Sequence, residues 1–148
     1  MTLETEVQSL RQVPMFKDID PARLKLLAFT SERVQFAGGQ RFFAQGDMSD
    51  AAYVILDGRA HVMLDTAHGE IKVADLGHNA LVGEMGILSD SPRSATIVAA
   101  EQTTALRIDK RVFLELLAQF PQIALAVMRE LADRLERTNA QLAAQSKA

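Results

Sequence analysis

The chain has 148 residues, a length that suits one domain and is sufficient to enclose a hydrophobic core. Its 16 basic and 19 acidic residues give a net charge of −3, which excludes an overall positive field that would attract nucleic acid or acidic membranes. Because the chain has no cysteine, disulfides, iron–sulfur clusters and thiol chemistry are excluded as well. The N-terminus lacks the apolar core of a signal peptide, and no apolar run approaches the roughly 18 residues of a membrane span. We therefore expect a cytoplasmic protein with no membrane-spanning segment.

The N-terminal part, about residues 1–33, is predicted to be helical. Its first apolar residues recur at helical spacing: Leu3, Val7 and Leu10. Pro14 interrupts this pattern. Asp20 and Pro21 then begin a second helix, because aspartate suits an N-cap and proline suits the first helical turn.

Residues 34–108 contain short apolar runs separated by turn signals, a pattern typical of a jelly roll. Asp57-Gly58 separates two such runs and predicts a β-hairpin. His68-Gly69-Glu70 predicts another turn, followed by a strand that runs into Gly77. The predicted fold is therefore mainly β with flanking helices, namely a double-stranded β-helix (jelly-roll) barrel.

Residues 109–148 are predicted to form two C-terminal helices, which complete a single domain spanning 1–148. Asp109 suits the N-cap of the first helix, and Pro121 ends it. The second helix has a stripe with steps of 3, 4, 3 and 4 residues and one polar member: Met128, Leu131, Leu135, Thr138 and Leu142. Because this spacing is typical of a coiled-coil seam, we expect a homodimer through this helix. The alternative is that the stripe packs on the barrel.

The segment around residues 82–99 carries the strongest chemical signal in the chain. Residues 84–88 are long enough for one helical turn, and the N-terminus of a helix presents free N–H groups that favour an anion. Arg93 adds a planar, permanently charged fork that matches phosphate oxygens. Beside such an anion, the carboxylate of Glu84 suits a ligand hydroxyl, together with partial pairing to Arg93. Together they favour a ribose phosphate, and the alternative is a Glu84–Arg93 ion pair that braces the loop.

The run GEMGILSDSPRSAT, residues 83–96, resembles the phosphate-binding cassette of the cyclic-nucleotide-binding domain family. That family includes the bacterial catabolite activator, protein kinase A regulatory subunits and cyclic-nucleotide-gated channels. Pro14-Met15-Phe16 and the glycines at 39, 46 and 58 also resemble the family pattern, so the resemblance covers nearly the whole chain. It implies a non-catalytic sensor that binds cAMP or cGMP in the β-roll and signals through repacking of the last helix.

The resemblance also implies which residues bind the nucleotide: Gly83, Glu84, Met85, Arg93, Ser94, Ala95, Thr138 and Asn139. Glu84 would accept a hydrogen bond from the ribose 2′-hydroxyl, and Arg93 would bind the cyclic phosphate with help from the Ser94 hydroxyl. The small glycine and alanine would leave room for the ligand to approach the backbone. Thr138 and Asn139 occupy the positions where the activator's last helix reads adenine, which favours cAMP over cGMP.

The chain departs from the family pattern in two places. Asn79 stands where the family usually has a glycine in a left-handed turn, a conformation that asparagine tolerates. The chain also ends after the last predicted helix, where a transcription regulator would continue into a helix-turn-helix, so direct DNA binding is not expected. We expect a stand-alone domain that acts on an unidentified downstream protein. The alternative is a regulatory domain of a larger channel or transcription regulator.

A cupin-like metal enzyme is the alternative from another functional class. Its candidate ligands are the three histidines and one glutamate: His61, His68, Glu70 and His78. They lack the His-x-His pair that cupins use. We therefore interpret these histidines as solvated surface residues, with a haem ligand at His78 as a further alternative, and expect neither a metal nor catalysis.

Overall fold

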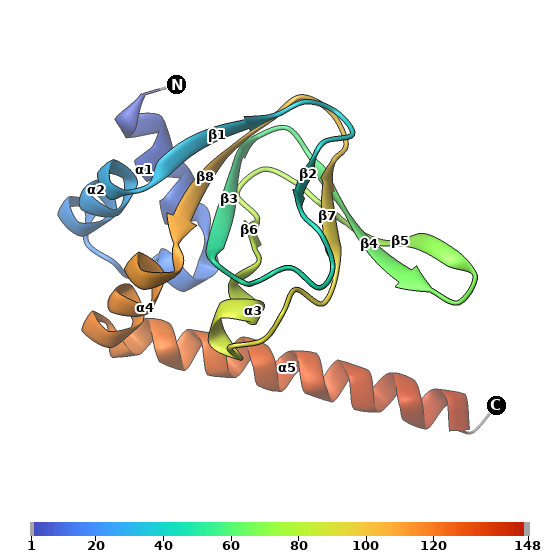
Figure 1. Ribbon diagram of the computed structural model, residues 1–148. Coiled ribbons are helices and arrows are strands. Elements are labelled where there is room, and N and C mark those ends of the chain that lie inside the picture. The colour runs from blue at the N-terminus through green and yellow to red at the C-terminus, as the bar shows by residue number, and fades with distance from the viewer. Residues whose placement is uncertain (1, 147–148) are drawn as a thin grey trace.

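The computed structural model describes residues 2–146 and contains two antiparallel sheets with helices packed against them (Figure 1). The elements in chain order are α1 (Leu3–Gln12), η1 (Pro14–Phe16), α2 (Pro21–Thr30), β1 (Glu32–Phe36), β2 (Arg41–Phe43), β3 (Ala51–Asp57), β4 (Ala60–Thr66), β5 (Gly69–Leu76), β6 (Leu81–Val82), α3 (Glu84–Leu88), β7 (Thr96–Ala99), β8 (Thr103–Asp109), α4 (Lys110–Gln119) and α5 (Pro121–Ser146). The predicted mainly β fold with flanking helices is confirmed, although the expected end points of the domain, residues 1 and 148, lie outside the described residues.

The two sheets have the strand orders β1-β8-β3-β6 and β2-β7-β4-β5. They form the expected jelly roll, although the two sheets are not closed into a barrel. Alternate residues of β3 point to opposite sides of the sheet, and both sides of this strand are buried. Ala52, Val54 and Leu56 pack toward the helices, whereas Tyr53 and Ile55 pack inside the roll.

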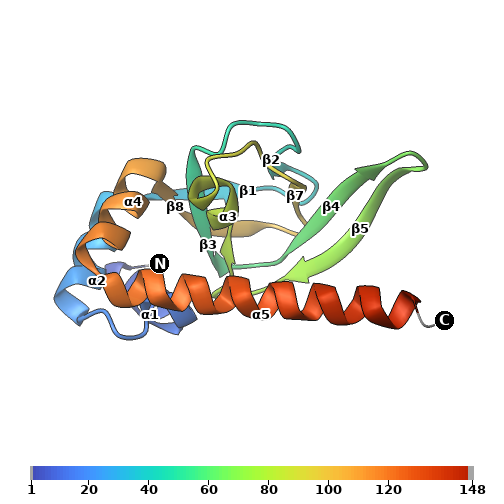
Figure 2. The ribbon, with the colours of Figure 1, turned by 90° about the horizontal axis from the view of Figure 1, so that it is seen from below.

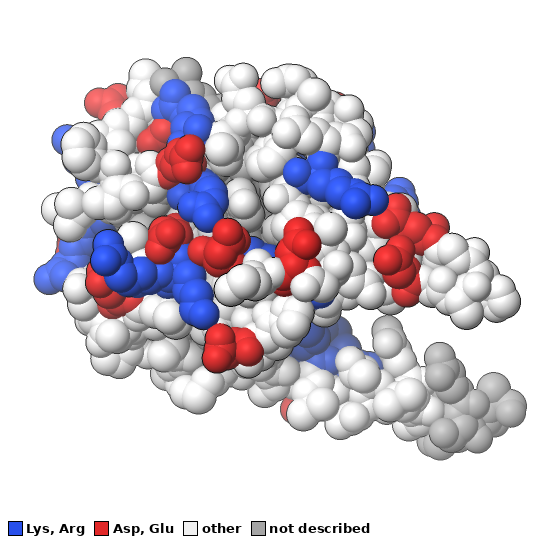
Figure 3. All heavy atoms as spheres, in the orientation of Figure 1, with Lys and Arg blue, Asp and Glu red and all other residues white. Residues whose placement is uncertain are grey.

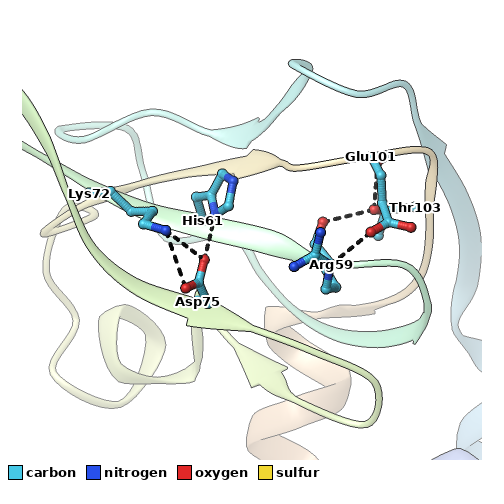
Figure 4. A network of polar contacts seen from close by, with 6 residues as sticks. All are labelled: Arg59, His61, Lys72, Asp75, Glu101 and Thr103. Carbon is cyan, nitrogen blue, oxygen red and sulfur yellow. Dashed lines mark hydrogen bonds and ion pairs between the residues drawn. The ribbon is translucent and has the colours of Figure 1, made fainter.

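The hairpin predicted at Asp57-Gly58 is wrong. Strand β3 pairs with β6 and β8, while β4 pairs with β5 and β7, so the turn carries the chain from one sheet to the other. Gly58 has a φ of 99°, and a Cβ there would lie 2.5 Å from Thr103 Oγ1. Beside this corner, the Thr103 hydroxyl donates to the Arg59 carbonyl at 3.0 Å, and Arg59 Nε donates to Glu101 at 2.8 Å (Figure 4).

The turn predicted at His68-Gly69-Glu70 joins β4 and β5 in a true hairpin, which projects from the roll (Figures 1 and 2). Asp75 on β5 lies 2.7 Å from His61 Nδ1 on β4 and 3.3 Å from Lys72 Nζ (Figure 4). Hydrogen bonds from His61 and then Lys72 lower the pKa of the Asp75 carboxyl. The His61–Asp75 contact links the two strands at the base of the hairpin, where β4 also pairs with β7, and the Lys72–Asp75 contact lies within β5.

The predicted helix starts are confirmed by their caps. The Asp20 side chain accepts a hydrogen bond from the Arg23 N–H at 3.1 Å, and Asp109 accepts one from the Arg111 N–H at 2.9 Å. The helices cover one sheet and enclose a core that includes Leu10, Phe16, Leu24, Phe113 and Ile123. A second core, within the roll, contains the rings of Phe36, Phe42 and Tyr53.

Helix α5 runs across the roll and continues beyond it (Figure 2). Ile123 and Val127 are buried and Leu131 packs partly on the core, but residues 132–144 are all exposed. The stripe therefore packs on the roll at Leu131, whereas Met128 and Leu135 remain 59% and 62% exposed.

On the face seen in Figure 3, acidic and basic side chains lie close to one another instead of forming a large region of one sign. Among residues 2–146, no single helix is both long and apolar enough to cross a membrane. Helices α4 and α5 meet that criterion only when taken together, and the chain bends by 105° between them.

Candidate functional site

The predicted single helical turn after Val82 is helix α3, and Gly83 is its N-cap. Gly83 adopts the left-handed region with a φ of 85°, where a side chain would be strained. The turn places Glu84 at the start of α3, inside the molecule. Arg93 follows in the loop that leads back to β7.

A cavity of about 200 Å³ lies beside α3 and the start of β7. Its lining combines the cassette with an apolar wall and one side chain of α5: Phe43, Val62, Leu76, Leu81, Val82, Gly83, Glu84, Met85, Gly86, Arg93, Ser94, Ala95, Ile97 and Arg134. The structure therefore brings together all six cassette residues that the sequence predicted.

The two other predicted site residues, Thr138 and Asn139, do not line this cavity. Both are exposed, and the Thr138 hydroxyl donates to the Arg134 carbonyl at 3.0 Å, one helical turn earlier. Arg134 itself lines the cavity. Sequence reasoning missed Arg134, although its position four residues before Thr138 places it on the same side of the helix.

Arg93 is the central charged group of the site and is only 4% exposed. Its Nη1 donates to the Gly83 carbonyl at 2.6 Å, and its Nη2 donates to the Ala51 carbonyl at 2.5 Å. Asp50 Oδ1 is 3.7 Å from Nη2. Burial lowers the pKa of Arg93, and the nearby Asp50 charge partly offsets that effect. The buried Nε has no hydrogen-bond partner among the described residues.

Glu84 is also buried, at 6% exposure, and burial raises the pKa of its carboxyl. A backbone hydrogen bond within Glu84 opposes that shift, as do the positive charges of Arg134 and Arg93, whereas Glu130 reinforces it. Glu84 and Arg93 form no ion pair in the part of the chain that the structure describes. The expected partial pairing of Glu84 with Arg93 is therefore corrected, and so is the alternative in which a full ion pair braces the loop, because two backbone carbonyls engage Nη1 and Nη2 of the guanidinium.

A larger hollow of about 590 Å³ lies between η1 and α5, and it shares Leu81 and Glu84 with the first cavity. Asn79 lies in its wall with a φ of 69°, which confirms the predicted left-handed turn. Glu84 therefore stands at the boundary between the cassette cavity and the contact region of α5. Its pKa also responds to Glu130 and Arg134, both on α5.

The three histidines do not gather around a common centre. Within residues 2–146, no three metal-ligating side chains lie close enough together to bind a metal ion. His61 pairs with Asp75 on the hairpin, and His68 and His78 are exposed.

The cassette cavity combines two buried charges of opposite sign that do not neutralise each other. The guanidinium has a buried N–H that lacks an acceptor, and the carboxylate is an acceptor held in a desolvated position. A ligand that supplies an anionic oxygen to the first and a hydroxyl to the second would satisfy both.

Comparison with known proteins agrees with this chemistry. The family described as "Cyclic nucleotide-binding domain" matches residues 33–120. The chain is 34% identical over 116 residues to lysophospholipase nte1 of Aspergillus oryzae, a match that covers 78% of this chain and 8% of that enzyme. It is 27% identical over 135 residues to a CRP-like cAMP-activated global transcriptional regulator of Mycobacterium tuberculosis, covering 90% and 60% of the two chains.

Among solved structures, the catabolite activator protein of Thermus thermophilus superposes with a TM-score of 0.81 at 30% identity. The match covers 90% of this chain and 63% of that one. The chain thus spans less than two thirds of each of these three proteins, and only a small part of the lysophospholipase.

Proposed function

Because the chain belongs to the cyclic nucleotide-binding domain family, we propose that it is a non-catalytic sensor that binds cAMP in the cassette cavity. The observation that carries this proposal is the buried guanidinium of Arg93, with an unpartnered Nε, at the wall of a cavity that also contains the Glu84 carboxylate. A cyclic phosphate would accept hydrogen bonds from Arg93. The ribose 2′-hydroxyl would donate to Glu84.

The remaining cassette residues have supporting roles in this proposal. The Ser94 hydroxyl would add a donor to the phosphate. Gly83 and Ala95 would let the ligand approach the backbone, and Met85 would contribute to the wall. Val62, Leu76 and Ile97 supply an apolar surface for the rest of the nucleotide.

The choice of cAMP over cGMP rests on the match of Thr138 to the adenine-reading position and on the similarity to a cAMP-activated regulator. Thr138 and Asn139 lie outside the cavity, while Arg134 on the same helix lines it. Contact between Thr138 and the base therefore requires α5 to shift toward the roll. A shift of α5 on binding would be the signal. The nucleotide would stabilise the shifted position of α5 to the extent that it binds that position more tightly than the unshifted one.

Partners and location belong to the same proposal. The exposed stripe of α5 would support a homodimer, and a downstream protein would respond to the movement of the helix. We include a cytoplasmic location because the similar protein of Mycobacterium tuberculosis is a transcriptional regulator. A role as the regulatory domain of a larger regulator or channel stays an alternative, because the similar proteins named above are longer than this chain.

The proposal is tested by calorimetric titration of nucleotide-free protein with cAMP and cGMP. We expect binding that Arg93→Ala weakens by at least about tenfold, since charge-assisted hydrogen bonds contribute about 1.5–3 kcal/mol. Arg59→Ala is the matched control, because Arg59 is 62% exposed and does not line the cavity. No binding of either nucleotide by the wild type, or equal losses in the two variants, would refute the proposal.

The same titration with 2′-deoxy-cAMP examines the carboxylate. The wild type should prefer cAMP, and Glu84→Ala should lose that preference because it removes the acceptor of the 2′-hydroxyl. If Glu84→Ala weakens both ligands equally, Glu84 does not contact the ribose.

A further inference from the structure

The ring of Phe43 covers one face of the Arg93 guanidinium, whose Cζ lies 3.9 Å from the ring centroid. A cation at this distance is attracted by the electron-rich face of the ring, and the attraction is stronger where water is excluded. Arg93 is 4% exposed, so the contact is desolvated. Hydrogen bonds hold the edge of a guanidinium, whereas a ring against its face also fixes the tilt of its plane.

The guanidinium is held from a second side by the backbone of Gly83. A Cβ at residue 83 would lie 2.6 Å from Arg93 Nη1 and 3.1 Å from Phe43 Cε2, so the three groups are in direct contact. Nη1 and Nη2 are engaged by the carbonyls of Gly83 and Ala51. The Nε is the nitrogen that has no acceptor among the described residues.

A β-bulge places Phe43 in this position. The register of β2 against β7 shifts between Arg41 and Phe43. In a regular strand, adjacent side chains point to opposite faces, but a bulge re-aims them. As a result both Phe42 and Phe43 reach the ring of Tyr53, at centroid distances of 5.5 and 6.1 Å.

The ring of Phe43 is thereby part of an aromatic cluster. Phe42 stacks on Phe36 at 4.0 Å, and Phe36 contacts Tyr53 edge-on at 6.2 Å. Of the three phenylalanines in this cluster, only Phe43 contacts the guanidinium and lines the cavity. The cluster can therefore support the orientation of a charged side chain at the edge of the core.

We propose that Phe43 is a positioning residue for phosphate recognition, holding the plane of the Arg93 guanidinium so that an anion meets its edge. This inference rests on the proposed function and deepens it. Without the ring, Arg93 keeps its charge and its carbonyl partners but gains freedom to tilt. The ligand must then restrict that motion on binding, which lowers its affinity.

The test is a cAMP titration of Phe43 variants. Phe43→Leu should weaken binding by roughly 5- to 30-fold, the range expected for a desolvated cation–π contact. Phe43→Tyr keeps the ring and should bind close to the wild type. Phe42→Leu is the matched control, since it removes the adjacent ring of the same strand without touching Arg93. Circular dichroism gives the folded fraction of each variant, and Phe43→Met replaces Phe43→Leu should the latter not fold.

The loss of cAMP affinity caused by Phe43→Leu is then measured in an Arg93→Lys background. A lysine has no planar group to orient, so removal of the ring should have a much smaller effect there. Equal losses in the two backgrounds, or equal losses for Phe43→Leu and Phe42→Leu, would overturn the inference while leaving nucleotide binding in place. Failure of the wild type to bind either nucleotide would instead overturn the proposed function, and the role of Phe43 with it.

Discussion

At the scale of single residues, the site places an acidic group where its charged form is disfavoured. Glu84 is 6% exposed, and burial is the main cause of its raised pKa. The charges of Arg134 and Arg93 lower the pKa but have smaller effects than burial. A carboxylate kept in such a position despite its cost is typical of a binding group, because a ligand hydroxyl can add a hydrogen bond to the one that the backbone supplies.

This placement predicts how the stability of the nucleotide-free protein depends on pH. A carboxyl whose pKa is raised in the folded state takes up protons more readily there than in the unfolded chain. Stability from this group is therefore fully present below its ordinary value of 4.5 and is lost as pH rises through the higher folded value. Glu84→Gln removes the charge, so we expect the variant to be more stable than the wild type at pH 7 and to lose that advantage near pH 4.

Urea unfolding of both proteins at the two pH values measures this difference. Asp75→Asn serves as the contrasting control, because hydrogen bonds from His61 and Lys72 lower the pKa of Asp75. For that group the sign is reversed: its stabilising contribution is present above its ordinary value of 3.8 and is lost as pH falls through the lower folded value, so Asp75→Asn should show no gain in stability at pH 7. If the advantage of Glu84→Gln is the same at both pH values, its origin is not the ionisation of the carboxyl.

At the scale of elements, the short helix α3 is fixed by the loop between β2 and β3. A Cβ at Gly86 would lie 2.0 Å from Ser49 Oγ and 2.8 Å from Ser49 Cβ. The Ser49 hydroxyl also donates to the Ser91 carbonyl at 2.6 Å, so it cannot turn away without losing that bond. Ser49 thus occupies the space beside Gly86 and ties the end of the cassette helix to the preceding loop.

From this contact we predict that Gly86→Ala destabilises the protein by about 1–3 kcal/mol, the usual cost of overpacking. The cost should shrink in a Ser49→Gly background, where the space is free. Gly77→Ala is a suitable control because a Cβ there would meet nothing within 4 Å. Urea denaturation of the four-member cycle measures the coupling, and an unchanged cost of Gly86→Ala in the Ser49→Gly background would show that the two residues act independently.

Local signals predicted the elements well, whereas pairings between distant segments could not be read from them. Asp20, Asp109 and Pro121 mark helix ends through contacts within a few residues, and the structure confirms them. Asp57-Gly58 carried an equally local signal, but the partners of β3 and β4 lie in other parts of the chain. The hairpin prediction failed because a turn sequence does not reveal to which sheet the next strand belongs.

The residues of the candidate site likewise fall into a local group, which the sequence predicted, and a distant group, which it did not. The six cassette residues come from one continuous segment and were predicted together, and all of them line the cavity. Phe43 and Arg134 reach it from β2 and α5, and only the folded chain brings them there. The sequence pattern around Phe43 could not predict its orientation, because the bulge that changes the direction of its side chain arises from the pairing of β2 with β7.

At the scale of the whole molecule, α5 is longer than the body that it packs on. Its 26 residues correspond to about 39 Å of helix, and residues 132–144 are exposed throughout. The exposed segment, residues 132–144, is so short that it would be only marginally stable as an isolated helix in water. Contact with another surface would therefore stabilise it. The exposed apolar residues Met128 and Leu135 lie on the stripe whose spacing suits a second α5.

We predict that the wild type sediments as a dimer and that Leu135→Lys sediments as a monomer, because the lysine would place two charges in the shared seam. Ala140→Lys is the matched control, since residue 140 is exposed on the opposite side of the helix from the stripe. It should leave the dimer intact. Nucleotide binding is measured on the same samples to test whether dimerisation affects the cavity. Such an effect is possible because Arg134, which lines the cavity, is adjacent to Leu135 in the chain. A wild type that sediments as a monomer with and without cAMP would leave the stripe without a role in self-association.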